Sequence, residues 1–166
     1  MIETRKRVLG QEHPSTLTSM ANLASTYQNQ GRWTEAEDLE EQVMEMRKRV
    51  LGQEHPSTLT SMANLALTYW NQGRWTEAEE LQATELEICS RVLGLEHPST
   101  LTSMANLAFI WKGHGRDVDA LELMKQCVEV RVRTLGSNHP YTLSSSTTLL
   151  RWEAEKLEVS TSAGRE

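Results

Sequence analysis

The sequence predicts an all-α fold in which one helix-turn-helix unit is repeated and stacked as an α-solenoid. The stretch RKRVLGQEHPSTLTSMANLA occurs at residues 5–24 and again, unchanged, at residues 47–66. The His-Pro pair of this stretch starts at residues 13, 55, 97 and 139, so the period is 42 residues. Within a unit, large apolar residues follow one another at steps of three and four, which indicates helices. A repeat of this length with two helices buries its apolar face by stacking on its neighbours.

The first helix of each unit, helix A, is expected between the His-Pro pair and the next glycine. Pro14 suits the first helical turn, and Gly31 suits the left-handed residue that follows a helix. The residues expected to face the core of helix A are Leu17, Met20, Leu23, Ala24 and Tyr27.

The second helix, helix B, is expected after the glycine, with Leu39, Val43, Met46 and Val50 on its apolar face. Thr34 and Glu37 have the spacing of a capping box, which Thr76 and Glu79 repeat, and Asp117 is expected to cap the third helix B. Basic residues gather at the end of helix B, where the helix dipole favours them. Glu40, Gln82 and Met124 occupy its middle. Glu85 lies on an apolar seam, so its carboxylate is expected to reach solvent or to pair locally rather than to act as a functional acid.

The period divides the chain into a series of repeats. Residues 1–10 are predicted to be the end of a preceding helix B, and full repeats span 13–52, 55–94 and 97–136. Residues 139–158 form a fourth helix A that acts as a C-terminal cap, and residues 159–166 form a disordered polar tail. We expect the chain to be cut from a longer array.

Composition and motifs favour a binding module over an enzyme. The 166-residue chain has a net charge of −6, which disfavours nucleic acid as a partner. No apolar run is long enough to span a membrane, and two cysteines, Cys89 and Cys127, fit a reducing, cytoplasmic setting. The repeated histidines lie one unit apart, so they are not expected to converge on a metal. No phosphate-binding loop or nucleophile motif is present, and no cofactor is predicted.

The residues Met20, Leu23, Ala24, Tyr27, Gly31, Trp33 and Ala36 fall at the signature spacings of the tetratricopeptide repeat. The 42-residue unit resembles the variant of kinesin light chains, and it resembles still more the C-terminal arrays of fungal NLR-like signalling proteins. The resemblance implies a right-handed superhelix whose concave groove is lined by helix A. It also implies that function depends on the groove surface, not on the fold.

The repeats differ where this groove is expected. Between residues 5–37 and 47–79 only two residues change, because Ser25 becomes Leu67 and Gln28 becomes Trp70. The third unit has Phe109 and Lys112 at these sites. An exposed Trp70 is a strong signal of a binding surface. The full set of candidate groove residues is Asn22, Ser25, Gln28, Asn29, Asn64, Leu67, Trp70, Asn71, Asn106, Phe109, Lys112 and Arg151.

The prediction is therefore a non-enzymatic scaffold that binds a protein or peptide in its groove, set in a fungal NLR-like protein. A kinesin-light-chain-like cargo adaptor is the alternative. A structural spacer, including a homo-oligomer formed by end-to-end stacking of repeats, is a third reading. Neutral drift between young duplicates would also explain the differences between the repeats.

Overall fold

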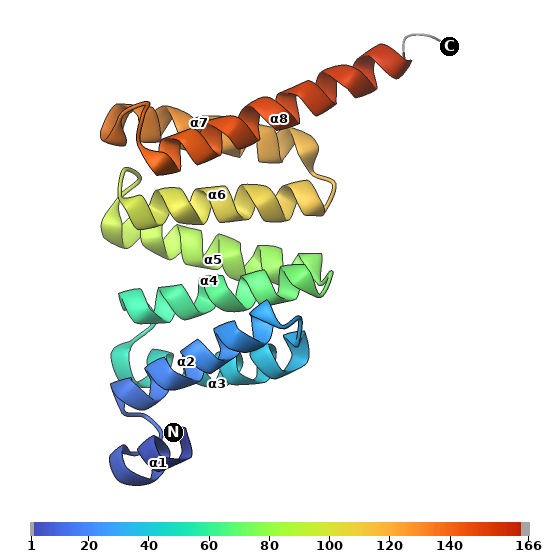
Figure 1. The fold of residues 1–166 in the computed structure, drawn as a ribbon. Helices are drawn as coiled ribbons and strands as arrows, with labels where there is room; N and C mark the ends of the chain where they lie inside the picture. The colour runs from blue at the N-terminus through green and yellow to red at the C-terminus, as the bar shows by residue number, and fades with distance from the viewer. Residues whose placement is uncertain (1, 164–166) are drawn as a thin grey trace. The chain divides into compact units, whose positions relative to one another are not determined.

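The computed structural model describes residues 2–163, and residues 1 and 164–166 lie outside the described part. All regular secondary structure in the described residues is α-helical, as predicted (Figure 1). The helices are α1 (Ile2–Leu9), α2 (Pro14–Asn29), α3 (Trp33–Leu51), α4 (Pro56–Asn71), α5 (Trp75–Leu93), α6 (Pro98–Gly113), α7 (Asp117–Leu135) and α8 (Pro140–Ala163). Helices α2, α4, α6 and α8 are the A helices, and α1, α3, α5 and α7 are the B helices.

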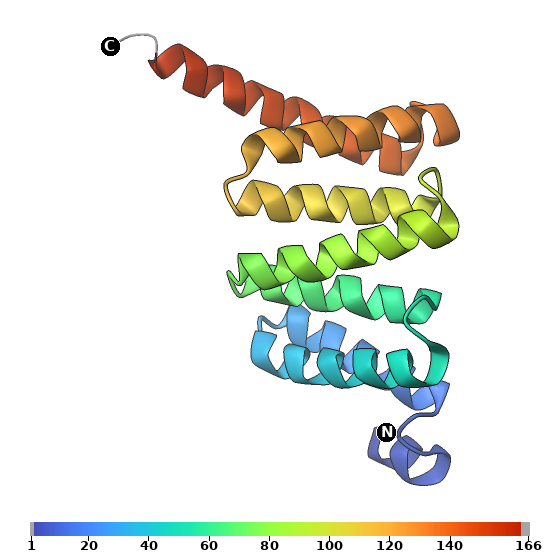
Figure 2. The same cartoon turned by 180° about the vertical axis from the view of Figure 1, so that it is seen from behind.

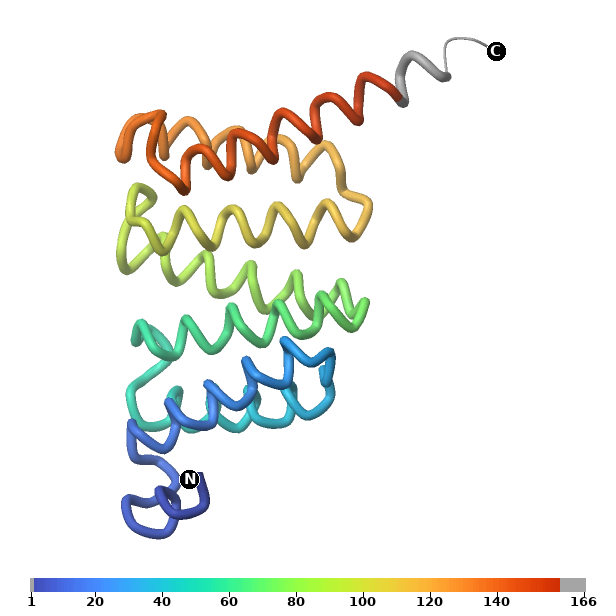
Figure 3. The backbone as a smooth tube through the Cα atoms, in the orientation of Figure 1, coloured from blue at the N-terminus to red at the C-terminus, as the bar shows by residue number. Residues whose placement is uncertain are grey.

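The chain forms two compact units, residues 1–92 and residues 93–166. In the first unit α1 contacts α2, α2 packs on α3, and α3 packs on α4. Helices α4 and α5 lie side by side in both opposite views (Figures 1 and 2). In the second unit α6 packs on α7, and α7 packs on α8. The short turns between consecutive helices are clear in the backbone trace (Figure 3).

Each A helix begins at a proline that is preceded by a capping histidine. The Nδ1 atom of His55 accepts a hydrogen bond from the backbone N–H of Ser57 at 3.1 Å, and Pro56 occupies the first helical turn. Equivalent bonds are made by His13, His97 and His139. The histidines thus satisfy one of the free N–H groups at the start of each A helix.

The A helices end at glycines in the left-handed region. Gly31 has a φ of 72°, and its N–H donates to the carbonyl of Gln28 at 2.9 Å. The N–H of Arg32 donates to the carbonyl of Tyr27, also at 2.9 Å. This pair of bonds is the Schellman motif, so the predicted role of Gly31 is confirmed.

The predicted capping boxes of the B helices are wrong. The Schellman turn starts α3 directly after Arg32, which is the N-cap and makes no side-chain capping bond. Thr34 therefore lies inside the helix. The Arg32 guanidinium instead stacks 4.1 Å from the centre of the Tyr27 ring and pairs with Glu35. In α7 the N-cap is Arg116, and Asp117, which we expected to cap, is the first helical residue.

The core of each unit consists of the apolar faces of its helices. In the first unit Met20, Ala24, Ala36 and Val43 are buried, in agreement with the predicted periodicity. Val50, which we also placed on the apolar face of helix B, is exposed. An alanine pair recurs in every full repeat, at residues 24 and 36, 66 and 78, and 108 and 120, and all six side chains are fully buried. Small side chains at these positions allow helix A and helix B to approach closely.

Helix α8 is longer than the other A helices. It continues to Ala163, so residues 159–163 are helical where we predicted the start of a polar tail, and residues 164–166 lie outside the described residues. Leu157 stands where the other repeats have the turn glycine, for example Gly31. Because no glycine interrupts the helix there, α8 continues past the position of the turn.

Candidate functional site

On the described A helices of the first unit, the large apolar residue that is exposed is Leu67 of α4. Its side chain is 48% exposed, although leucine is a core residue elsewhere in the repeat. Asn71, also exposed, donates from Nδ2 to the carbonyl of Leu67 at 2.8 Å. Asn64 is half-buried on the same helix. An apolar side chain bordered by amides can anchor an apolar group while hydrogen-bonding a peptide backbone.

In the second unit the equivalent residue is Phe109 of α6, which is 38% exposed. Its ring packs edge-on against the buried Trp152 of α8, with ring centres 5.2 Å apart. Asn106 is half-buried one turn before it. Trp152 holds the Phe109 ring in place while leaving part of it in contact with solvent, which suits an aromatic anchor.

The second variable position is turned toward the interior rather than toward an open groove. Gln28 is half-buried, and its Nε2 donates to Glu40 Oε1 and to Thr68 Oγ1, both at 2.8 Å. The hydroxyl of Thr68 donates to Glu40 Oε2 at 2.6 Å. Gln28 therefore links α2, α3 and α4, and the placement of its side chain on the open surface is wrong.

Trp70, at the same position of the second repeat, is half-buried and not exposed as predicted. Its ring lies edge-on to Trp75, with the centres 5.9 Å apart. The Nε1–H of Trp70 is buried and has no hydrogen-bond partner among the described residues. Most of the side chain thus serves packing, which weakens the argument for Trp70 as a binding anchor.

Lys112, at this position of the third repeat, is held by two carboxylates. Its Nζ lies 3.0 Å from Asp117 and 3.1 Å from Glu155. Burial lowers the pKa of Lys112, but these two ion pairs outweigh it and the pKa is raised. Because its charge is compensated, Lys112 does not supply free positive charge near Phe109. Arg151 is exposed on α8.

The remaining candidates lie on α2. Asn22 and Asn29 are exposed, and Ser25 is half-buried. Ser25 stands where α4 has Leu67, so the first repeat presents a polar surface at the position where the second is apolar.

Glu40 is an electrostatically unusual group in the first unit. It is buried, and burial raises its pKa to about 7, although the hydrogen bond from Thr68 works in the opposite direction and the charge of Glu37 adds to the increase. The sequence places Glu40 in the middle of helix B but indicates no role for it. Its contacts with Gln28 and Thr68 show that it forms the polar centre of the junction between the first two repeats.

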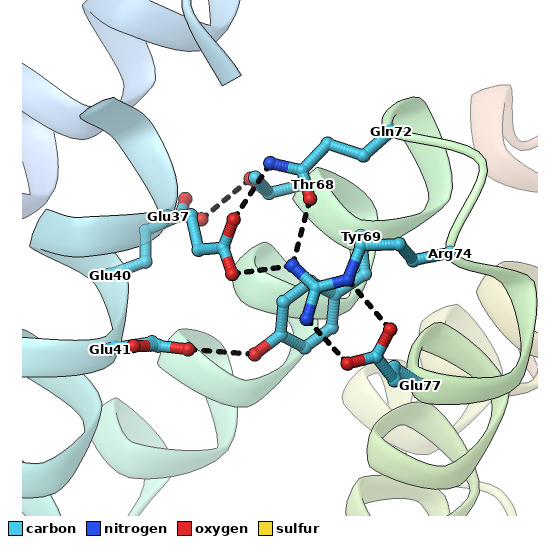
Figure 4. Close-up of polar contacts among 8 residues, drawn as sticks. All are labelled: Glu37, Glu40, Glu41, Thr68, Tyr69, Gln72, Arg74 and Glu77. Carbon is cyan, nitrogen blue, oxygen red and sulfur yellow. Dashed lines mark hydrogen bonds and ion pairs between the residues drawn. The ribbon is translucent and has the colours of Figure 1, made fainter. Parts of the chain in front are cut away.

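A second set of polar contacts extends this junction toward the surface (Figure 4). Arg74 stacks over the Tyr69 ring at 4.2 Å and pairs with Glu37 and Glu77. The Tyr69 hydroxyl donates to Glu41 at 2.9 Å. The pKa of Tyr69 is raised to about 12, mainly by burial and to a smaller extent by this hydrogen bond. These contacts connect α3 with α4 and with the start of α5, so they fix the neighbouring repeats in register.

The buried Glu85 of α5 has local partners. Its carboxylate accepts hydrogen bonds from Gln82 Nε2 at 2.7 Å and from Cys89 Sγ at 3.0 Å. All three residues are buried. This confirms the prediction of a locally paired carboxylate.

A pocket of about 300 Å³ lies beside α8 in the second unit. It is lined by Lys112, Asp117, Val118, Leu121, Trp152, Glu155 and Lys156. Its lining combines apolar side chains with Lys112 and the two carboxylates that pair with it. In residues 2–158 no group of three or more histidine, cysteine or acidic side chains could hold a metal ion. None of the helices in the described residues is long and apolar enough to cross a membrane.

Comparison with known proteins supports the repeat assignment. Family models described as Tetratricopeptide repeat match residues 16–57 and 57–131. The comparison with curated proteins gives no match.

Solved structures of similar repeats also resemble the chain. The nearly identical TPR-like repeats of a Podosopora anserina protein described as a kinesin light chain are 37% identical, with a TM-score of 0.78 over 95% of this chain and 74% of that chain. A point variant of those repeats is 36% identical, with a TM-score of 0.79 over 98% of this chain and 80% of that chain. BtubC (BKLC) from P. vanneervenii, 21% identical with a TM-score of 0.79 over 96% of this chain and 64% of that chain, shares the fold. The chain therefore belongs to the tetratricopeptide repeat family.

Proposed function

We propose that the chain is a non-enzymatic scaffold that binds a protein or peptide through the outward side chains of its A helices. The exposed Leu67 on α4 and Phe109 on α6 carry this proposal. These large apolar residues occupy a position where the first repeat has a serine, and exposed apolar side chains framed by amides are typical of recognition surfaces. Membership of the tetratricopeptide repeat family supports a protein partner.

The two interior residues of the predicted site, Gln28 and Trp70, are better explained by packing than by binding. Gln28 belongs to the polar junction around Glu40, and Trp70 packs against Trp75. The proposal accordingly rests on Leu67 and Phe109, with Asn64, Asn71 and Asn106 as bordering amides. Asn22, Asn29 and Arg151 stay as outer members of the proposed surface.

The proposed setting is the sensor array of a fungal NLR-like protein, in the cytoplasm, on the resemblance of the repeated sequence. The alternative of a kinesin-light-chain-like adaptor is favoured by the likeness to the Podosopora anserina repeats. The coding sequence upstream of Met1 separates the two: a P-loop ATPase there supports the NLR-like setting, whereas a heptad-repeat coiled coil supports the adaptor.

The binding proposal can be tested with a displayed library of random peptides selected on the wild-type protein. Leu67→Ser places the first repeat's own residue in the second repeat, so the fold should tolerate it. We expect Leu67→Ser and Phe109→Ser to weaken binding of the selected peptides tenfold or more in a calorimetric titration, because the apolar contact area is lost.

The matched control is Leu95→Ser, which removes another exposed leucine from the loop before α6. Selected peptides should bind this variant as they bind the wild type. If peptides bind all three variants alike, the A-helix surface is not the binding site.

A further inference from the structure

One face of α8 carries an uncovered apolar stripe. Leu143, Thr147, Leu150, Ala154 and Leu157 follow one another at steps of four and three, and all five are exposed. The three leucines are 50%, 66% and 67% exposed. This spacing, about 3.5 residues on average, is that of the seam between two paired helices. We call these five residues the leucine seam.

Two positions of this face are buried in the other A helices. Leu143 corresponds to Leu17, Leu59 and Leu101, each at most 3% exposed, and Leu150 corresponds to Ala24, Ala66 and Ala108, which are fully buried. Helices α2 and α6 pack on the B helices of their own repeats. Helix α8 packs on α7 through its opposite side, where Trp152 is buried. The predicted role of α8 as a cap requires a polar outer face, which the leucine seam does not provide.

The seam differs from the surface that receives a helix B. Leu150 stands where every full repeat has an alanine, so a B helix could not approach α8 as closely as it approaches α2 or α6. Leu157 replaces the turn glycine, and the helix continues straight through this position. The seam therefore extends over 15 residues, about 21 Å at 1.5 Å per residue, along one uninterrupted helix. Both views show α8 continuing past the N-terminal end of α7 (Figures 1 and 2).

We propose that the leucine seam pairs with the leucine seam of a second copy of this chain, with the two α8 helices antiparallel about a two-fold axis. Large and small side chains alternate along the seam, which makes it self-complementary in this direction. Leu150 of each copy then lies against Ala154 of the other, and Leu157 lies against Thr147 of the other. A parallel pair would place small residues opposite each other and leave a gap in every second layer. An antiparallel pair also aligns the helix dipoles favourably.

The seam is short, so the dimer forms reversibly at high micromolar protein concentration. The test is sedimentation velocity of the full chain between about 5 and about 500 μM. The wild type should change from the 18.8 kDa monomer toward a dimer as concentration rises. The double variant Leu150→Glu with Leu157→Glu should stay monomeric throughout. Because both residues are exposed, its helical circular dichroism should match that of the wild type.

Two matched variants distinguish this dimer from other modes of association. Val8 is an apolar residue of α1 that is 69% exposed, and end-to-end stacking of repeats would bury it, so Val8→Glu tests that mode. Leu95→Glu changes an exposed loop leucine. Both should dimerise like the wild type. If Val8→Glu abolishes association, or if association persists in the double α8 variant, the proposal is wrong. A wild type that is monomeric at about 500 μM also overturns it.

Cross-linking tests the antiparallel arrangement. A mixture of Thr147→Cys and Leu157→Cys chains should form a disulfide-linked heterodimer under mild oxidation, because these residues share a layer in the antiparallel pair. Homodimers of either variant alone would instead show a parallel pair. The native thiols, Cys89 and Cys127, are buried.

Discussion

Glu40 is a buried carboxyl group whose partners, Gln28 and Thr68, are neutral. Its pKa is raised to about 7 in the folded chain, above the ordinary value of 4.5. Between pH 4.5 and about 7 the unfolded state has released the proton of Glu40, whereas the folded state still binds it. The stabilisation by protonated Glu40 is therefore lost as the pH rises through about 7. At about 1.4 kcal/mol per pKa unit, the loss is at most about 3–4 kcal/mol.

Glu40→Gln should remove this pH dependence. The substitution keeps the shape and the acceptor oxygen, and the second repeat already has Gln82 at this position, buried within α5. We expect the variant to be more stable than the wild type at pH 8 and similar to it at pH 4.5, measured by urea unfolding. Glu45→Gln, at an exposed site on the same helix, is the control and should retain the wild-type slope. An unchanged slope in Glu40→Gln would show that another group titrates.

The capping histidines provide a second prediction at this scale. His55→Ala removes the Nδ1 acceptor for the N–H of Ser57 and should lower the free energy of unfolding by about 1 kcal/mol. His55→Asn offers another side-chain acceptor and should restore most of the loss. Equal losses in both variants, from urea midpoints, would mean that the imidazole acts by packing.

At the scale of the element, the two kinds of turn glycine differ in conformation. Gly31 has a φ of 72°, in the left-handed helical region. Gly52 has a φ of 94° and a ψ of 163°, a region that essentially only glycine adopts. A Cβ added at either position would meet no atom within 4 Å, so any cost of substitution comes from the backbone.

Asparagine should therefore separate the two turns. Gly31→Asn should cost clearly less than Gly31→Ala, because asparagine tolerates the left-handed region. At Gly52 both substitutions should cost a similar amount, about 1–3 kcal/mol. Thermal unfolding of the four variants measures the difference. A rescue by asparagine at Gly52 would contradict the turn geometry.

An arginine clamp joins each of three B helices to the A helix that follows it. In the clamp between α3 and α4, Arg47 Nη1 donates to the carbonyl of Ser57 at 3.0 Å and to Ser61 Oγ at 2.9 Å. Arg5 and Arg131 make the same contacts in α1 and α7, whereas α5 has Cys89 at this position.

Arg47→Cys, which introduces the residue of α5, should destabilise the first unit by about 1.5–3 kcal/mol, because charge-assisted hydrogen bonds are lost from a half-buried carbonyl and hydroxyl. Arg47→Lys should recover part of this, since it restores charge without the planar fork. Urea unfolding measures both variants. If Arg47→Cys has no effect, the contacts do not contribute to stability.

The helices and their starts could be predicted because they depend on signals local in sequence. Proline, glycine and a three-four apolar spacing identify the ends and the buried face of each helix. The capping boxes were predicted wrongly because the Schellman turn leaves no room for a separate cap between Gly31 and Trp33. Whether a tight turn forms a Schellman motif or a side-chain capping box depends on its backbone geometry.

At the scale of the whole molecule, the candidate site was only partly predictable, because a helical wheel describes one helix without its neighbours. The wheel placed Gln28 and Trp70 with the outward residues, but long side chains at the edge of a face can reach the next helix. A signal was present in the sequence: where Gln28 becomes Trp70, Glu40 becomes Gln82 and Thr68 becomes Ile110. Positions that change together in this way indicate a junction between repeats.

This separates two kinds of difference between the repeats. The change from Gln28 to Trp70 accompanies changes at the positions of the hydrogen-bond partners of Gln28, which are Glu40 and Thr68, so we attribute it to packing. The change from Ser25 to Leu67 and Phe109 produces exposed apolar side chains, which packing within each unit does not require. We therefore centre the proposed binding surface on this position.

The central proposal is that the outward faces of the A helices bind peptides, through Leu67 in the first unit and, as a separate site, through Phe109 in the second. The most direct measurement is an NMR titration of the isotopically labelled wild-type chain with a peptide selected from the displayed library. The amide signals of Asn64, Leu67, Asn71, Asn106 and Phe109 should shift most, and those of α3 and α7 should shift least. Shifts concentrated on α3 and α7, or in the His-Pro loops, would contradict the claim.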